Sequence, residues 1–338
     1  MNKYLILLLA IACFTSCSKS SSDKPEANNF SISLDTVQVD SKDEILFLNF
    51  SLGISTLDPA QKFLYNMNMR EFVFEKINLE TLSLDSLSKM EKEGPNGIGS
   101  FLSKVIALED GGFVFSTGYV LNFLDVNGNK MRQITLEREP FIKDVLPPGK
   151  GINIQSSGIS ADGKFLAGLY DNSGMGEKPD GIVWLDLTTN TGKTIPSKAF
   201  DFIIENNLAL ELDGNLAGGT SGMVSVEAQQ DKIIFSPSSR NSVMIYDLAL
   251  DTLIIKKFES KLTSNQTKPG ETKTVTSIDE FTKLREELEK DVRFGSWQLD
   301  QKTGYRWRFA RQLDRTIGED SLIFKTVLTA VDENFEML

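Results

Sequence analysis

Residues 183–196 read "VWLDLTTNTGKTIP": an apolar strand that ends at Asp186, a polar turn and a second strand. The same pattern surrounds Asp125 in "FLDVNGNKMRQITL" and Asp247 in "MIYDLALDTLIIKKF", so these aspartates recur 61 residues apart. Asp favours a tight turn at such a position because its carboxylate accepts hydrogen bonds from the backbone that follows. A hairpin repeated at a fixed interval predicts a repeated β unit.

Weaker copies of the pattern surround Asn78 and Asp300, with partial copies at Asp35 and Asp332. The main copies follow a further strand with its own turn, as in "SADGKFLAG" at 160–168, which resembles pieces of WD-repeat and related bacterial propellers. Four strands at intervals of about 45 to 60 residues is the period of propeller blades. We therefore predict an all-β fold, a β-propeller of about six blades, with a β-sandwich as the alternative. The strand around Asp35 is expected to close the ring.

Sustained helical periodicity occurs convincingly once, in "TSIDEFTKLREELEKDV". Ser277 and Glu280 have the spacing of a capping box, and the apolar residues from Ile278 to Val292 recur on one face. The sequence thus predicts one inserted amphipathic helix near 277–292. The helix could cover one mouth of the ring as a lid or pack on its side, and side packing is the prediction.

The N-terminus reads "MNKYLILLLAIACFTSC", a basic residue followed by an apolar run that is too short to span a membrane. Small residues before Cys17 resemble the lipobox of bacterial lipoproteins, with Cys13 as a rival position and an ordinary secretory signal as the alternative. We predict a lipoprotein signal peptide at 1–16, a flexible tether at 17–29 and a single propeller domain at 30–338.

In that lipoprotein class, Cys17 is acylated, with palmitate among the acyl groups, and becomes the first residue of the mature chain. Several acyl chains hold a protein stably to a bilayer. The predicted location is therefore the cell envelope, and Ser18 after the anchor favours the outer membrane. Cleavage at Cys17 leaves no free thiol for a disulfide or a nucleophile.

The side-chain inventory excludes many kinds of chemistry. The 338 residues contain no histidine, which removes Ser-His-Asp catalysis and histidine-ligated zinc. With 36 basic and 47 acidic side chains, the net charge of −11 disfavours nucleic acid as a partner. We predict no metal, no cofactor and no catalytic residue. Carboxylates remain as acid–base groups, and a glycosidase needs only two of them.

Two short segments superficially match binding loops. "TNTGKT" at 189–194 lacks the first glycine of a phosphate-binding loop, and Leu187 stands in its place. "DVNGNK" at 125–130 begins like a calcium loop, but Leu136 occupies the position of the bidentate glutamate. Both segments are predicted to be β-turns.

The segment "YRWRFAR" alternates aromatic and basic residues. Such a mixture occurs in proteins that bind single-stranded nucleic acid. On an acidic chain, strict alternation favours a strand instead. We expect Tyr305, Trp307 and Phe309 to face the core and Arg306 and Arg308 to face solvent.

The glycine-rich loop "EKEGPNGIGS" at 91–100 raises the question of a phosphate site. Its glycines are spaced three and two residues apart and a strand follows, whereas a dinucleotide loop precedes a helix. Pro95-Asn96-Gly97 predicts a turn between two blades. If the loop touches a ligand, Asn96 is the predicted contact.

Several segments together resemble one family: "LYNMN", "NLETLSLD", "EGPNGIG" and "FGSWQLDQKTGYRWRFAR". They are similar to Bacteroidetes lipoproteins grouped as a domain of unknown function with a propeller-like fold, and more loosely to six-bladed propeller lipoproteins of the same bacteria. The resemblance implies no activity and no site residue beyond Cys17. Members of the group continue past the position of Asp332, so the last blade is expected to be truncated at the C-terminus.

The sequence thus predicts an uncharacterised, membrane-anchored lipoprotein without enzymatic activity. Its propeller would bind a protein or glycan partner or act as a scaffold. The alternative is a carboxylate-dependent enzyme that processes glycans at the funnel of the propeller.

Overall fold

The computed structural model describes residues 35–47, 52–172, 176–318 and 321–338. Val37–Met337 form one compact unit, and the following description concerns that unit. Cys17 lies outside the described residues. Asp35 is described but lies outside the compact unit, and it belongs to no strand.

Four sheets are antiparallel meanders of four strands each, as the alternating sequence patterns predict. Sheet 1 contains β1 (Ser55–Leu57), β2 (Phe63–Asn68), β3 (Val73–Asn78) and β4 (Ser83–Lys89). Sheet 2 contains β5 (Lys104–Ala107), β6 (Phe113–Ser116), β7 (Val120–Leu124) and β8 (Lys130–Thr135). Sheet 3 contains β9 (Gly151–Ile159), β10 (Phe165–Asp171), β11 (Gly181–Asp186) and β12 (Thr191–Pro196). Sheet 5 contains β15 (Val224–Ala228), β16 (Lys232–Pro237), β17 (Ser242–Asp247) and β18 (Thr252–Lys257).

The other two sheets depart from this plan. Sheet 4 contains β13 (Leu208–Leu212), β14 (Asn215–Thr220) and β19 (Lys273–Val275), with β13 and β19 parallel. Sheet 6 contains β20 (Arg293–Phe294), β21 (Gln298–Leu299), β22 (Arg306–Ile317) and β23 (Ser321–Val331). The helical segments are α2 (Pro140–Val145), the 3₁₀ turn η2 (Asp201–Ile204) and α3 (Ile278–Glu289). Six sheets in the described part of the chain confirm the all-β prediction of about six blades.

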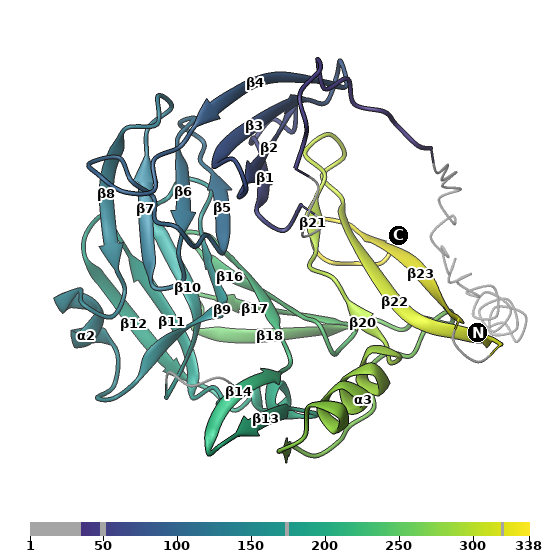
Figure 1. Ribbon diagram of the computed structural model, residues 1–338. Coiled ribbons are helices and arrows are strands. Elements are labelled where there is room, and N and C mark those ends of the chain that lie inside the picture. Colours follow the sequence, from purple (N-terminus) through teal and green to yellow (C-terminus); the bar gives the residue numbers. More distant parts are fainter. Residues whose placement is uncertain (1–34, 48–51, 173–175, 319–320) are drawn as a thin grey trace, which may run out of the picture. The chain divides into compact units, whose positions relative to one another are not determined.

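Hydrophobic clusters join sheets 1, 2, 3, 5 and 6 in that order (Figure 1). Sheets 1 and 2 share a cluster that includes Phe74 and Phe115, and sheets 5 and 6 share one that includes Val243 and Trp297. Burying such side chains removes apolar area from water at about 25 cal/mol per Å². The seams between sheets therefore hold the apolar core of the unit.

Gly158 explains how sheets 3 and 5 approach each other. A Cβ atom at Gly158 of β9 would lie 2.1 Å from the carbonyl oxygen of Val226 on β15. No side chain fits at that distance, so glycine permits the two strands to meet backbone against backbone. The close approach brings Leu169 and Phe235 into one core cluster.

Sheets 6 and 1 are joined differently. The Gln61 side chain donates a hydrogen bond to the Leu299 carbonyl at 2.8 Å and accepts one from the Gln301 amide at 3.2 Å. The described residues form no hydrophobic cluster across this seam. The strand predicted around Asp35 lies partly outside the described residues, and its closing role stays a prediction. Beyond it, Asp40 forms a bridge with Ser83 at the outer strand of sheet 1.

Helix α3 begins where the sequence predicts. The Ser277 side chain accepts a hydrogen bond from the Glu280 amide, which satisfies one of the free donors of the first turn. Phe281, Leu284 and Leu288 pack against the cluster of sheet 4. The helix therefore packs on sheet 4, and the choice between a lid and side packing on the ring stays a prediction.

Strand β22 confirms the predicted strand but reverses its faces. Arg306 and Arg308 are buried, whereas Phe309 is 59% exposed. The reason is a cage of backbone carbonyls: the Arg308 guanidinium donates to Gly295 at 2.8 Å, Ser242 at 2.9 Å and Arg240 at 3.2 Å, and also to Pro237. Burial lowers the pKa of Arg308 to about 9, so the guanidinium stays charged at neutral pH.

Candidate functional site

The meander topology gives the unit two different faces. In each four-stranded meander, the first and third connections lie at one end of the strands, and the second connection lies at the other end. Hydrogen bonds between neighbouring sheets bring equivalent strand ends together, as when the Glu109 amide donates to the Ala161 carbonyl at 2.9 Å. We call the side of the unit with the first and third connections the turn face. The opposite side, where the chain also passes between sheets, is the insertion face.

On the turn face, every connection is short and an Asp or Asn side chain holds most of them. Asp186, for example, accepts hydrogen bonds from the Thr188 hydroxyl and from the Thr188 and Thr189 amides. These donors, with the Thr188 hydroxyl first, lower the pKa of Asp186 to about 2. The predicted turn role of the recurring aspartates is therefore confirmed. Side chains that accept such local bonds are Asp58, Asn78, Asp110, Asp125, Asp162, Asp186, Asp247, Asp300 and Asp332.

On the insertion face, five connections are long, and polar contacts join some of them to one another. The Arg240 guanidinium pairs with Glu205 at 3.0 Å, and the Asn206 side chain donates to the Lys268 carbonyl at 2.7 Å. These bonds link segments that lie far apart in the sequence. The connections span 90–103, 136–150, 172–180, 197–223 and 258–292, and residues 173–175 are not described.

Two cavities open on the insertion face, beside the connections of sheets 2 and 3. The first has a volume of about 340 Å³ and is lined by Tyr119 and by residues of the α2 connection. The second has a volume of about 330 Å³ and lies between 178–180 and 196–201. Lys150 lines the first cavity and Asp180 the second, and their side chains form an ion pair of 2.6 Å. We call the two cavities together the insertion-face groove.

The groove is positively charged in a chain that is acidic. Four lysines and three acidic residues line it, whereas the whole chain has a net charge of −11. Lys150 pairs with Asp180, and Lys178 pairs with Asp201 at 2.7 Å. Lys143 and Lys198 are exposed and have no ion pair within the described ranges. The lining charges are Lys143, Lys150, Lys178, Lys198, Glu137, Asp180 and Asp201.

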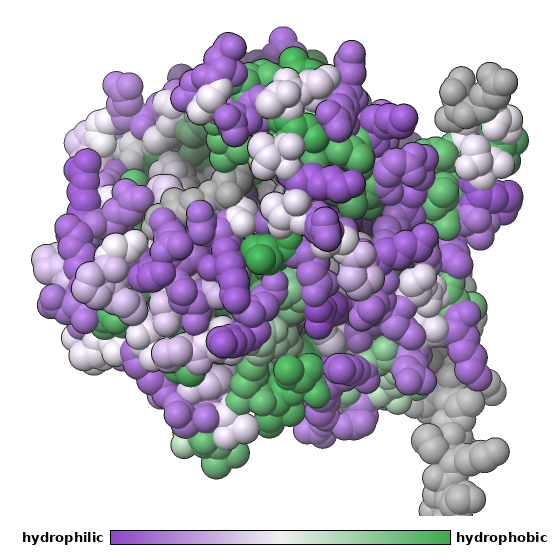
Figure 2. Space-filling model, turned by 90° about the horizontal axis from the view of Figure 1, so that it is seen from below, coloured by the Kyte–Doolittle hydropathy of each residue, from purple (hydrophilic) through white to green (hydrophobic). Residues whose placement is uncertain are grey.

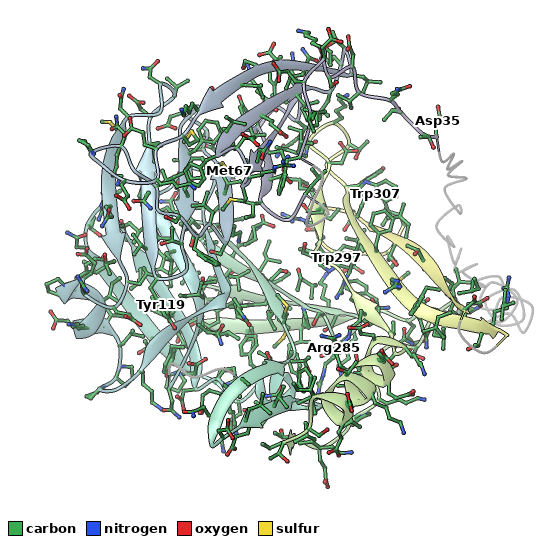
Figure 3. The ribbon with its side chains drawn as sticks, in the orientation of Figure 1. Asp35, Met67, Tyr119, Arg285, Trp297 and Trp307 are labelled. Carbon is green, nitrogen blue, oxygen red and sulfur yellow. The ribbon has the colours of Figure 1, made fainter. Side chains whose placement is uncertain are left out.

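Prolines and one aromatic ring form part of the groove walls. Proline fixes its own backbone angle, and the walls contain Pro147, Pro148, Pro179 and Pro196. The Tyr119 side chain is 39% exposed, and Figure 3 shows it on the side of the unit where sheets 2 and 3 lie. An exposed aromatic ring beside lysines suits a ligand that has an apolar face and acidic groups.

Tyr170 lies behind the groove on β10 and is buried. Burial raises the pKa of Tyr170, and the nearby Asp180 carboxylate adds to the effect. The Asp180 amide donates to the Tyr170 carbonyl at 2.9 Å. The backbone of β10 therefore fixes the position of the acidic residue that pairs with Lys150.

The buried carboxylates of the unit are held by amides. Glu75 accepts hydrogen bonds from the side chains of Asn66 at 2.7 Å and Asn68 at 3.1 Å, and from the Phe47 amide at 3.0 Å. Asp171 accepts one from the Asn153 side chain at 2.7 Å. These bonds hold the two carboxyl groups in place within the first and third sheets.

The predicted contact Asn96 lies outside the groove. Its side-chain oxygen accepts a hydrogen bond from the Lys130 amide at 3.1 Å, so the loop is attached to sheet 2. A Cβ at Gly97 would lie 2.5 Å from the Glu93 backbone, which explains the glycine in this turn. The loop connects β4 with β5, as predicted, and the ligand contact of Asn96 stays a prediction.

Sequence reasoning missed the groove. Its residues come from four connections that lack any spacing motif, and only the run Pro147-Pro148-Gly149 signals an unusual connection. No set of three or more His, Cys, Asp or Glu side chains in the described ranges is placed to hold a metal ion. Of the helices that the described residues form, none has the length and apolar character needed to cross a membrane.

Residues 27–338 match the model of a family described as a domain of unknown function, DUF4221. A crystal structure of a DUF4221 member from Bacteroides vulgatus is similar, with a TM-score of 0.57 and 15% identity over 84% of this chain and 79% of that chain. The β-propeller domain of Cps50 (Swd1) from Myceliophteria thermophila aligns with a TM-score of 0.39 and 8% identity, over 81% of this chain and 70% of that chain. No curated protein sequence matches this chain.

Proposed function

The chain belongs to the DUF4221 family and has a propeller-like fold, and from this premise we propose that it is a non-enzymatic binding protein of the cell envelope. In this proposal, Cys17 carries the lipid anchor, the tether follows, and the insertion face binds a partner. The anchor proposal rests on the N-terminal sequence alone.

The distribution of polar groups supports a binding role for the insertion face. The recurring carboxylates of the turn face accept hydrogen bonds from their own turns. The insertion-face groove instead presents Lys143, Lys198 and the Tyr119 ring to solvent. This contrast is the observation on which the proposal depends. It favours a ligand with carboxylates, such as a glycan chain that contains uronic acids, because ammonium groups attract carboxylates and tyrosine stacks on the apolar face of a sugar.

An array of neutral glycans, uronic-acid glycans and acidic peptides tests the proposed function. We expect the purified chain to bind uronic-acid glycans, and to bind them less at high salt because exposed charges are screened. The proposal would be refuted if the chain bound only neutral glycans, or if it bound no compound on the array. A parallel assay for reducing sugar separates binding from hydrolysis, and release of sugar would favour the glycan-processing enzyme.

A fractionation experiment tests the anchor separately. Cys17→Ser should move the protein from the membrane fraction into the soluble fraction, because no acyl chain is then attached. Cys13→Ser is the matched control and should leave the protein with the membrane. Retention of the Cys17→Ser protein would contradict the anchor without affecting the binding proposal.

A further inference from the structure

Strand β23 leaves one edge unpaired in the described part of the chain. On one side it pairs with β22 along its whole length, and the two strands form a long hairpin, drawn in yellow in Figure 1. On the other side, an isolated bridge joins Val331 with Met337. Between 321 and 330, no described strand pairs with that side. An edge of ten residues extends for about 33 Å and presents a row of free backbone donors and acceptors.

The composition of this edge differs from that of a protected edge. Proteins usually blunt exposed edges with charges, prolines or bulges. Strand β23 reads "SLIFKTVLTAV", with Lys325 as its single charge and no proline. Leu322 is 39% exposed and Ile323 is 36% exposed. Such an edge favours pairing with another extended strand.

Symmetry restricts the registers that two copies of this strand can adopt, and charge and the number of paired residues favour one of them. In a two-fold antiparallel pair, one residue faces its own copy, and the residues on either side of it face each other in order. A pair centred on Lys325 would place two ammonium groups opposite each other, which destabilises a sheet. A pair centred on Thr326 places Lys325 opposite Val327 and Phe324 opposite Leu328. That register has no like charges opposite each other and pairs nine residues, 322–330, with their copies.

We infer that β23 is the dimer interface of this protein, at which two copies pair antiparallel about a two-fold axis through Thr326. The two sheets then form one continuous sheet across the axis. Main-chain hydrogen bonds supply the attraction, and the Phe324–Leu328 contacts and the Thr326–Thr326 contact set the register. The inference is independent of the proposed binding role of the groove, which lies on sheets 2 and 3.

Sedimentation velocity at increasing concentration tests the interface, with the full chain in detergent micelles under reducing conditions. We expect the unmodified chain to dimerise. Thr326 is exposed, so Thr326→Lys and Thr326→Glu should leave the fold intact. Each should weaken dimerisation about fivefold, because the added charge faces its own copy at the axis. Within one chain Thr326 faces Arg311, so the two variants would change hairpin stability in opposite directions.

Mixing the two variants provides the decisive arm of the test. A mixture of Thr326→Lys and Thr326→Glu chains should form a heterodimer at least as stable as the unmodified dimer, because opposite charges then meet at the axis. Thr316→Lys, on the exposed part of β22, is the matched control and should dimerise normally. A monomeric unmodified chain, or a mixture without heterodimer, would overturn the inference. In a monomer, protection from hydrogen exchange of those 322–330 amides that point away from β22 would also overturn it, because the edge would then be covered within one chain.

Discussion

The turn face and the insertion face are formed by the same strands, but different kinds of hydrogen bond hold them. On the turn face, Asp186 bonds with residues two and three positions further along the chain. On the insertion face, Arg308 donates to the carbonyl of Pro237, and Thr272 donates to that of Ile204. The side-chain bonds of the turn-face aspartates are therefore local, whereas these insertion-face bonds join distant segments.

The difference separates repeated structure from specific structure. A local bond needs one suitable residue in each turn, so the same turn can recur along the chain. A long-range bond needs two segments that are already in place, and each such bond is unique. The insertion face is thus the part of the unit that can form a particular groove. Figure 2 shows hydrophobic side chains exposed among hydrophilic ones on the side where sheet 4 and α3 lie, and Leu216 and Ile278 are among the exposed residues.

The largest expected effect concerns Arg308. Arg308→Leu leaves buried carbonyls of the β16–β17 connection without donors and should lower the free energy of unfolding by about 3 to 5 kcal/mol. Urea denaturation measures this change. Arg311→Leu is the matched control, because Arg311 is exposed on the same strand, and should change stability by less than about 1 kcal/mol. Equal effects of the two substitutions would show that the carbonyl cage does not hold the insertion face.

A smaller effect is expected on the turn face. Asp186→Ala removes the acceptor for three donors, which can form hydrogen bonds with water instead. The substitution should therefore lower the free energy of unfolding by about 1 kcal/mol. Hydrogen exchange should become faster at Thr188 and Thr189 and remain unchanged in the other turns. Asp231→Ala is the control, because this exposed carboxylate accepts no hydrogen bond from the described residues. A loss of protection that spreads to the insertion face would contradict the local character of the turns.

Asn96→Ala should have a similar or slightly smaller effect, of about 0.5 to 1 kcal/mol, because it removes one half-buried hydrogen bond to the Lys130 amide. Exchange at the Lys130 amide should become faster. Glycan binding should be unchanged, since Asn96 does not line the groove. A loss of binding without a loss of stability would instead support the ligand contact that the sequence predicts.

The smallest effect is a dependence on pH. The pKa of Asp186 is lowered from 3.8 to about 2, so its contribution to stability is complete above about pH 4 and is lost as the pH falls towards 2. Asp186→Asn should lack this contribution and show a flatter stability profile over that interval. NMR titration of the Asp186 carboxylate measures the pKa directly. A value near 3.8 would mean that the Thr188 and Thr189 donors do not hold the ionised form.

The sequence predicted the local features of the fold well. The recurring aspartates, the all-β class and the capping box at Ser277 depend on neighbours within a few residues, and a linear pattern contains that information. The loop around Pro95-Asn96-Gly97 was recognised as a turn for the same reason. These features make up most of the turn face and the start of α3.

Features that depend on distant partners could not be read in the same way. Alternation correctly placed "YRWRFAR" in a strand, but the choice of buried face depended on carbonyls in and beside another sheet, which lie 66 to 71 residues away in sequence. Aromatic residues normally occupy the core, and the need to satisfy buried carbonyls outweighed that preference at Arg308. The groove was missed because Tyr119, Lys150 and Asp180 come together only after sheets 2 and 3 pack.

The central claim is that the insertion face binds the partner and the turn face does not. The most direct measurement is the affinity of four variants for a uronic-acid glycan: Tyr119→Ala and Lys143→Ala in the groove, with Val126→Ala and Lys302→Ala on the turn face as matched controls. We predict that the groove variants bind about tenfold more weakly, a loss of about 1.4 kcal/mol, while the turn-face variants keep the original affinity. Unchanged binding by both groove variants, or an equal loss in the turn-face variants, would contradict the claim.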